Sequence, residues 1–246
     1  MQQSRSSAAL ATLAPAAITP AVFLLCYRWA PVWLFPVLVA APLVPSFALA
    51  VRRGLAGPAL LAALLWAASL CACATTVSMH RPQEAEAAIW NARAYAEKTL
   101  QWVRTGEGEE GSPSRFLPRH ALELMAFAAL AAATGGVAAL VLGAALLNHM
   151  SFYVAALWRL SGGVSWALVL GWPPWALVRI VAYVALGTAL AGVLLTRRLP
   201  PGSHRPPFAR GLLIVGLAGV VLDVLLKAFL AAPWRQVLLR ALGGPP

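Results

Sequence analysis

Charged side chains are scarce in this sequence: they make up only 11% of its 246 residues, and only eight of them are Asp or Glu. Soluble domains usually carry about 25% charged and about 45–50% apolar residues, whereas 61% of this chain is apolar. So few charges cannot cover the surface of a water-soluble monomer, and so apolar a chain excludes intrinsic disorder. The composition therefore predicts an all-α fold, a polytopic membrane helix bundle formed as one integral membrane domain over residues 1–246.

Lysine and cysteine are also rare. Only two of the 19 basic residues are Lys, and the Arg residues gather at the ends of apolar segments, which is typical of topology signals at a membrane surface. Because no basic stripe with interleaved aromatic residues occurs, no nucleic-acid partner is expected. The three Cys have neither redox nor zinc spacing, so we expect them to pack as small apolar side chains within helices. No metal and no cofactor is predicted.

Six apolar segments are long enough to cross a bilayer, which takes about 20 residues. The first contains four prolines and is predicted as one kinked spanning helix, since proline is tolerated in membrane helices when neighbours satisfy the freed carbonyls. Residues 8–26 form a further span, which would be the seventh, an interfacial helix or an uncleaved signal-anchor. If 121–160 is one long bent unit instead of two spans, the count falls to five. The six predicted spans are 30–51, 56–78, 121–147, 150–170, 175–196 and 208–232.

The Arg content of the short loops predicts the orientation of these spans. Two Arg occupy the 52–53 turn and four occupy the 197–210 loop, whereas the 171–174 turn has none. Since Arg-rich loops stay in the cytoplasm, both basic loops are predicted inside, and 80–119 and 171–174 outside. The Arg-, Ala- and Leu-rich composition is typical of a GC-rich bacterial genome, so the expected location is the bacterial cytoplasmic (inner) membrane.

Residues 80–119 differ from the rest of the chain because they carry six basic and six acidic residues. Within them, one helical face is apolar and mostly Ala, which predicts an amphipathic helix over about 84–103 along the outer membrane interface. The Gly- and Glu-rich stretch 106–114 is expected to be a flexible acidic loop. A short interfacial helix is also predicted over 233–242. The apolar face of the first helix consists of Ala88, Ala92, Ala96, Leu100 and Val103.

Two ionisable residues, Asp223 and Lys227, lie deep in the last predicted span. An ionised side chain in the hydrocarbon core costs roughly 2.5–3.5 kcal/mol on insertion scales, so such residues usually face the bundle. Their i,i+4 spacing places them one turn apart on one helix face. Gly216 and Gly219 precede them on that face, which allows a neighbouring helix to approach closely. The two are interpreted either as a self-neutralised pair that fixes packing or as an ion or proton site.

His120 and Glu123 open the third predicted span with the spacing H-x-x-E, which places both on one face of the first helical turn. Negative charge is favourable near a helix N-terminus. Two ligands are too few for a metal site in a bundle. We therefore expect a capping role, or pairing of these residues with Arg119 or Arg115.

Arg159 and Arg179 lie near the ends of predicted helices, and Asn148–His149 lies between two predicted spans. Arginine at such positions usually anchors a helix at the lipid headgroups. The alternative is a polar cavity that Glu123, Arg159 and Arg179 share inside the bundle. These arginines complete the set of candidate intramembrane ionic residues.

Catalytic signatures are missing from the sequence. It contains no H-E-x-x-H, no G-x-S-x-G and no P-loop, so no catalytic residue is proposed. Small residues recur at helical spacing, as at Ala132/Gly136 and Gly187/Ala191, and indicate helix-packing faces that also suit other membrane subunits. The leading hypothesis is a non-enzymatic scaffold or accessory subunit of a membrane complex, with the lipid bilayer as its surroundings. The alternatives are a small transporter or permease subunit that uses intramembrane charges, and an intramembrane enzyme acting on lipid.

One stretch resembles a known family. Residues 116–135 begin Phe-Leu-Pro-Arg-His-Ala-Leu-Glu-Leu-Met-Ala and resemble the motif L-P-H-G-x-x-E-x-x-A of the stage II sporulation protein M family of bacterial membrane proteins. Pro118, Glu123 and Ala126 match this motif in spacing, whereas an Arg-His pair stands where the family has His-Gly. The resemblance implies a small multi-span protein that organises membranes and has no assigned catalytic site.

A second stretch resembles another family. The residues R-L-S-G-G at 159–163, followed by R-I-V-A-Y at 179–183, are similar to the G-G and R-x-x-A-Y elements of bacterial Yip1-domain proteins. The spacing between the two elements is longer here than in that family. This resemblance likewise implies a non-enzymatic role, in membrane organisation or trafficking.

Overall fold

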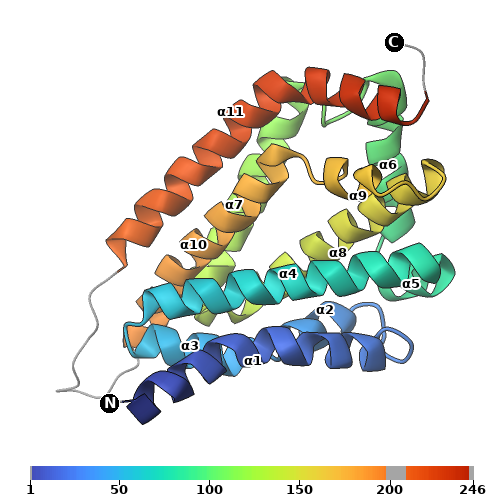
Figure 1. Cartoon of the computed structure of the whole chain (residues 1–246). Helices are drawn as coiled ribbons and strands as arrows, with labels where there is room; N and C mark the ends of the chain where they lie inside the picture. The colour runs from blue at the N-terminus through green and yellow to red at the C-terminus, as the bar shows by residue number, and fades with distance from the viewer. Residues whose placement is uncertain (1, 198–208, 244–246) are drawn as a thin grey trace.

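The structure, a computed structural model, describes residues 2–197 and 209–243, and every regular element in these ranges is a helix (Figure 1). Five of the helices are long and apolar enough to cross a membrane. The chain is therefore a multi-pass membrane protein with an all-helical fold, as its composition predicts. These five are α4 (Ala56–His80), α7 (Pro113–Thr134), α8 (Val137–Leu160), α10 (Pro174–Arg197) and α11 (Arg210–Ala241).

The segment 30–51 is not the single kinked span that was predicted. It forms two short helices, α2 (Phe35–Ala40) and α3 (Val44–Arg52), joined by a turn. Pro42 and Pro45 lie at this turn, and each removes a backbone donor that a continuous helix needs. Backbone hydrogen bonds between residues three apart close the turn instead, such as the bond from the Leu43 N–H to the Ala40 carbonyl.

The first helix, α1 (Gln2–Cys26), covers the segment whose role was left open. Its apolar part, Thr12–Cys26, is shorter than the five long helices. It packs against α4, which in turn packs against α8. Trp66 of α4 donates its indole N–H to the Val39 carbonyl of α2 and is fully buried, so the N-terminal helices form part of the same core.

The boundary between α7 and α8, the second and third long helices, lies at Gly135–Gly136, so the predicted spans 121–147 and 150–170 are displaced. Both glycines have positive φ, 65° and 92°, which is accessible to glycine at no steric cost. A Cβ atom at Gly136 would lie 2.7 Å from the Phe47 ring of α3, so the turn also requires close packing. Asn148 and His149, predicted between spans, lie inside α8. The predicted span 150–170 is divided between the end of α8 and the short helix α9 (Trp166–Leu170).

The amphipathic segment 84–103 is helical but broken. It forms α5 (Pro82–Ala88) and α6 (Ala92–Thr105), separated at Asn91, which has a left-handed φ of 54°. The predicted Ala-rich face is buried, with Ala96 and Val103 at 3% and 0% exposure. This face packs against α8 rather than lying alone on a membrane surface.

The last two long helices, α10 and α11, pack closely through small residues. A Cβ atom at Gly219 would lie 2.7 Å from the Ala182 Cβ, and one at Gly216 would lie 2.9 Å from Leu186. Figure 1 shows α11 bending before its final segment, where Pro233 lies within the helix. The separate helix predicted over 233–242 is thus the end of α11.

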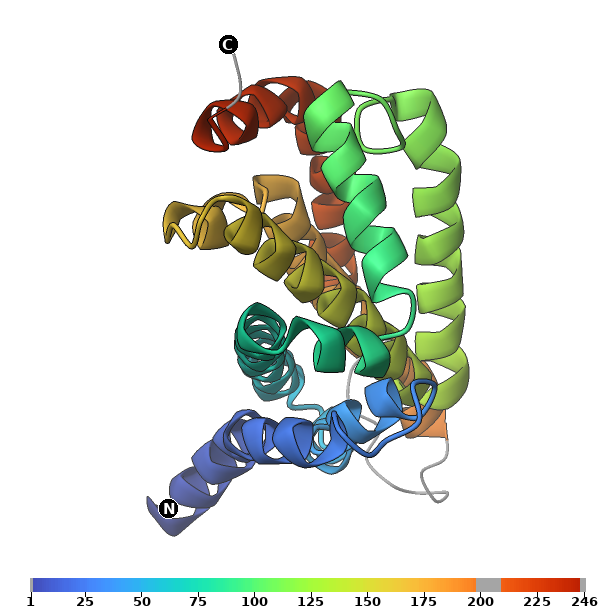
Figure 2. The same ribbon diagram turned by 90° about the vertical axis from the view of Figure 1, so that its right-hand side faces the viewer.

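Beyond this bend, α11 reaches the end of α6. Arg235 donates hydrogen bonds to the carbonyls of Trp102, Val103 and Arg104, which lie in the last turn of α6. A cation at the C-terminus of a helix satisfies unpaired carbonyls and complements the helix dipole. Figure 2 shows α6 and the start of α7 on the same side of the molecule, joined by the loop 106–112.

Several helix ends lie together at one end of the bundle. The start of α4, the turn between α7 and α8, and the end of α10 lie at one end of the bundle, where Gly135 contacts Leu195 and Gly136 contacts Phe47 (Figure 1). The basic turn 52–53 lies at this end, and so does the end of α10, where the second basic loop begins. This agrees with the prediction that both basic loops lie on the same side of the membrane. The second basic loop, 197–210, lies almost entirely outside the described residues, and the assignment of this end to the cytoplasm stays a prediction.

Candidate functional site: a polar cavity beside a buried aspartate

Asp223 is the only aspartate of the sequence, and it is completely buried. Arg179 of α10 binds it in a two-pronged contact, with Nε 2.9 Å from Oδ2 and Nη2 3.0 Å from Oδ1. His120 of α7 places Nε2 2.9 Å from the same Oδ2, an ion contact that is poorly directed for a hydrogen bond. The aspartate therefore joins three long helices.

This arrangement corrects the expected pairing of Asp223 with Lys227. The close approach of α10 and α11 at Gly219 lies one turn before Asp223, and so brings the start of α10 within reach of the carboxylate. A planar guanidinium that binds a carboxylate through two donors is the strongest pairing available to it. Arg179 was expected to act as a headgroup anchor, but it is instead the counterion of Asp223 inside the bundle.

Lys227 has a partner of its own. Its Nζ lies 2.8 Å from Oε2 of Glu110, in the loop between α6 and α7. The ammonium also lies 4.6 Å from the centre of the Phe116 ring, within the range of a cation–π contact. Although Lys227 is only 4% exposed, its charge is thus compensated by a loop that was predicted to be flexible.

Glu109 anchors the same loop at a second point. Its carboxylate contacts Lys98 of α6 at 2.5 Å and Arg119 of α7 at 2.7 Å. Partial burial opposes ionisation of Glu109, but these two cations outweigh it and hold the pKa of this carboxyl below its usual value. Arg119 also binds Glu123 at 2.9 Å, which confirms the expected pairing of Glu123 with a neighbouring arginine.

These groups surround a polar cavity of about 370 Å³. Its walls come from α6, the loop 106–112, α7, α8, α10 and α11, so it lies between elements that are far apart in the sequence. Lys98 and Arg119 are about half exposed, so the cavity reaches the surface of the protein. Four cations and four carboxylates line it or contact its lining residues: Lys98, Arg119, Arg179, Lys227, Glu109, Glu110, Glu123 and Asp223.

Arg159 lies outside this site. It donates a hydrogen bond to the Ser78 carbonyl of α4 and stacks its guanidinium over the Phe152 ring at 5.8 Å. The polar cavity predicted for Glu123, Arg159 and Arg179 thus forms around two of the three. His120, Lys227 and Asp223 complete it, so five of the six candidate ionic residues converge.

Sequence reasoning missed the contribution of α6 and the acidic loop. Lys98, Glu109 and Glu110 were interpreted as parts of a solvated surface segment, and His149 as a loop residue. The available indication was the high density of ionisable residues between 98 and 123 in a chain that has few elsewhere. No periodicity connects them, because they meet only through the fold.

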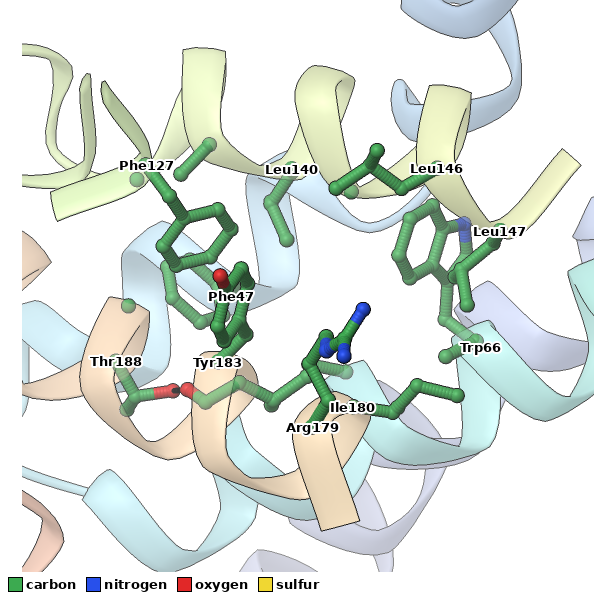
Figure 3. Close-up of a pocket in the computed structure, with 17 residues that line it drawn as sticks. Phe47, Trp66, Phe127, Leu140, Leu146, Leu147, Arg179, Ile180, Tyr183 and Thr188 are labelled. Atoms are coloured by element: carbon green, nitrogen blue, oxygen red, sulfur yellow. Dashed lines mark hydrogen bonds between the residues drawn. The ribbon is translucent and has the colours of Figure 1, made fainter. Parts of the chain in front are cut away.

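A second, apolar cavity of about 100 Å³ adjoins this site, between α3, α4, α7, α8 and α10. Figure 3 shows Arg179 and Tyr183 extending from α10 into this space, with the Tyr183 ring beside that of Phe127. Arg179 lines both cavities. The Tyr183 hydroxyl is buried without a hydrogen-bond partner, whereas the Trp66 and Thr188 polar atoms in the same wall are satisfied by backbone carbonyls.

Comparison with known proteins does not assign the chain to a family. No protein-family model matches it, and neither a curated protein nor a solved structure matches it. The local resemblances to the stage II sporulation protein M family and to Yip1-domain proteins stay predictions.

Proposed function

We propose that this protein is a small membrane transporter or permease subunit of a bacterial inner membrane, with the polar cavity as its binding site. The observation that carries this proposal is the convergence of ionisable side chains from six elements on one cavity that reaches the surface. Charged groups inside a membrane bundle are costly to maintain and typically mark the pathways of ions and substrates.

The charge balance of the cavity indicates what it binds. Its four cations and four carboxylates cancel, so a ligand with net charge would leave one charge uncompensated in a medium of low dielectric constant. A ligand that carries one charge of each sign adds no net charge and finds both donors and acceptors. We therefore propose a zwitterionic ligand.

The alternative, a scaffold subunit, has weaker support. It was motivated by small-residue helix faces, but several of these are occupied within the chain. Gly216 and Gly219 pack against α10, and a Cβ atom at Gly187 would lie 3.2 Å from the Phe127 ring of α7. A partner helix could still use exposed apolar surface such as that of α11, which includes Ile214 at 67% and Phe229 at 75% exposure, but such surface equally suits lipid.

A thiol placed in the cavity tests the proposal. With the three native Cys replaced by Ala, Thr99→Cys puts the thiol in the cavity wall, since Thr99 lines it. Gln101→Cys, two residues along on α6 and exposed, serves as the matched control. Both variants are reconstituted into vesicles and treated with a bulky impermeant thiol reagent. Two transport activities are then measured: uptake of radiolabelled amino acids, and transbilayer movement of a zwitterionic phospholipid with a fluorescent acyl chain.

The protein is expected to move at least one of these zwitterions faster than protein-free vesicles do. Labelling at Thr99→Cys is expected to lower that rate at least tenfold, while labelling at Gln101→Cys leaves it within twofold. The proposal is wrong if neither class of zwitterion moves, or if the two labelled variants behave alike.

A further inference from the structure

We infer that the zwitterion bound in the polar cavity is the headgroup of a membrane lipid, whose apolar part enters the adjoining apolar cavity. This inference rests on the proposed function and names the class of ligand for the same site. A soluble zwitterion would fill only the polar cavity. The structure places a polar and an apolar compartment against one shared side chain, which is the pattern that an amphiphile requires.

Arg179 is that shared side chain. It lines the cavity of about 370 Å³ on one side and the cavity of about 100 Å³ on the other. With its guanidinium fixed by Asp223 through two hydrogen bonds, its position marks a constant boundary between the compartments. A lipid phosphate lies at such a boundary, with its cationic group directed to the carboxylates of Glu109, Glu110 and Glu123 and its chains directed away from them.

Tyr183 supplies an independent observation. Its side chain is 6% exposed, and its hydroxyl has no hydrogen-bond partner although it lines the apolar cavity. An unsatisfied buried hydroxyl is unfavourable by about 1–3 kcal/mol, so a ligand that offers it an acceptor is favoured. Lipids carry an ester carbonyl just beyond the headgroup, at the junction of their polar and apolar parts. Tyr183 lies one helical turn from Arg179, where such a carbonyl would lie.

The size of the apolar cavity limits what it encloses. A cavity of about 150 Å³ is known to hold one benzene molecule, so about 100 Å³ accommodates the first few methylene groups of a chain. The remainder of the chain must continue into the bilayer. This excludes a large apolar ligand enclosed as a whole and fits a lipid that is held at its upper end.

Gly143 allows the apolar cavity to be closed without disturbing the ionic residues. It lines this cavity, and a Cβ atom built there meets nothing within 4 Å. Gly143→Leu therefore occupies the space that the chain would take. Gly57→Leu is the matched control, because Gly57 is also helical, also has nothing within 4 Å, and does not line the cavity.

Binding is measured by equilibrium dialysis on the full chain purified in detergent, with three radiolabelled probes. These are dihexanoyl phosphatidylethanolamine, glycerophosphoethanolamine as its headgroup alone, and dihexanoyl phosphatidylglycerol as an anionic lipid. We expect the zwitterionic lipid to bind at least tenfold more tightly than either other probe. Gly143→Leu is expected to weaken its binding at least tenfold without affecting the headgroup alone, and Gly57→Leu to leave it within twofold.

Three results would overturn the inference: equal binding of the headgroup alone, unchanged lipid binding in Gly143→Leu, or tighter binding of the anionic lipid. Each of these leaves the transport proposal standing, because the Thr99→Cys experiment does not depend on the apolar cavity. Loss of the thiol effect at Thr99→Cys would instead remove the polar cavity as the binding site, and the lipid inference with it.

Discussion

Removing the carboxylate of Asp223 is expected to destabilise the protein through Arg179 rather than through Lys227. Asp223→Asn keeps the size of the side chain but leaves a buried guanidinium without its counterion. Breaking a buried ion pair from one side typically costs about 3–5 kcal/mol. Replacing Arg179 by Met as well removes the orphaned charge, so the double variant should recover at least half of that loss.

Lys227 provides the control within the same helix. It lies one turn from Asp223 but is bound to Glu110, so the two sites share no partner. The coupling between Asp223→Asn and Lys227→Met in the free energy of unfolding should therefore be smaller than the coupling between Asp223→Asn and Arg179→Met.

The free energy of unfolding is measured by titration with a denaturing detergent in mixed micelles, following circular dichroism. Five variants and the wild type suffice: Asp223→Asn, Arg179→Met, Lys227→Met and the two doubles that contain Asp223→Asn. Arg179 is not the main counterion of Asp223 if the double variant with Lys227→Met recovers more stability than the one with Arg179→Met. The same role is contradicted if Asp223→Asn alone changes the free energy of unfolding by less than about 1 kcal/mol.

Three further outcomes can be checked with the same titration. Gly219→Val should cost about 1–3 kcal/mol because its side chain overlaps α10, while Gly211→Ala, with nothing within 4 Å, should be neutral. Arg235→Ala should cost about 1–2 kcal/mol through the lost bonds to the end of α6. Glu109 has a lowered pKa, so its ionised form stabilises the fold above its ordinary pKa of 4.5, and this contribution is lost as the pH falls through the lower folded value. Glu109→Gln should therefore lose less stability than the wild type between about pH 6 and about pH 3.

Composition and periodicity were sufficient for the class of fold and for most helices. The apolar share of the chain predicted a helix bundle, and the Ala-rich face of residues 84–103 predicted which side of α6 is buried. Both follow from local properties of the sequence. The helix break at Gly135–Gly136 could also have been predicted from the sequence, because a Gly-Gly pair is a turn signal. These glycines were interpreted instead as part of a helix-packing face.

The partners of the charged residues could not be derived in this way. Spacing along one helix paired Asp223 with Lys227, since both lie on the same face of α11. The actual partner of Asp223, Arg179, is 44 residues away and reaches it only because α10 and α11 pack closely at Gly219. Such pairing is fixed by tertiary packing, and no local rule for one helix contains it.

The order of the chain has a consequence for biosynthesis. Arg179 and His120 leave the ribosome before Asp223, so α7 and α10 enter the membrane before their common counterion has been made. An uncompensated Arg costs roughly 2.5–3.5 kcal/mol in the hydrocarbon core, which keeps the start of α10 close to the insertion machinery or the bilayer surface until α11 follows. Insertion of the last helix thus completes the membrane integration of α10. A product truncated before α11 would expose a cation that membrane quality control can recognise.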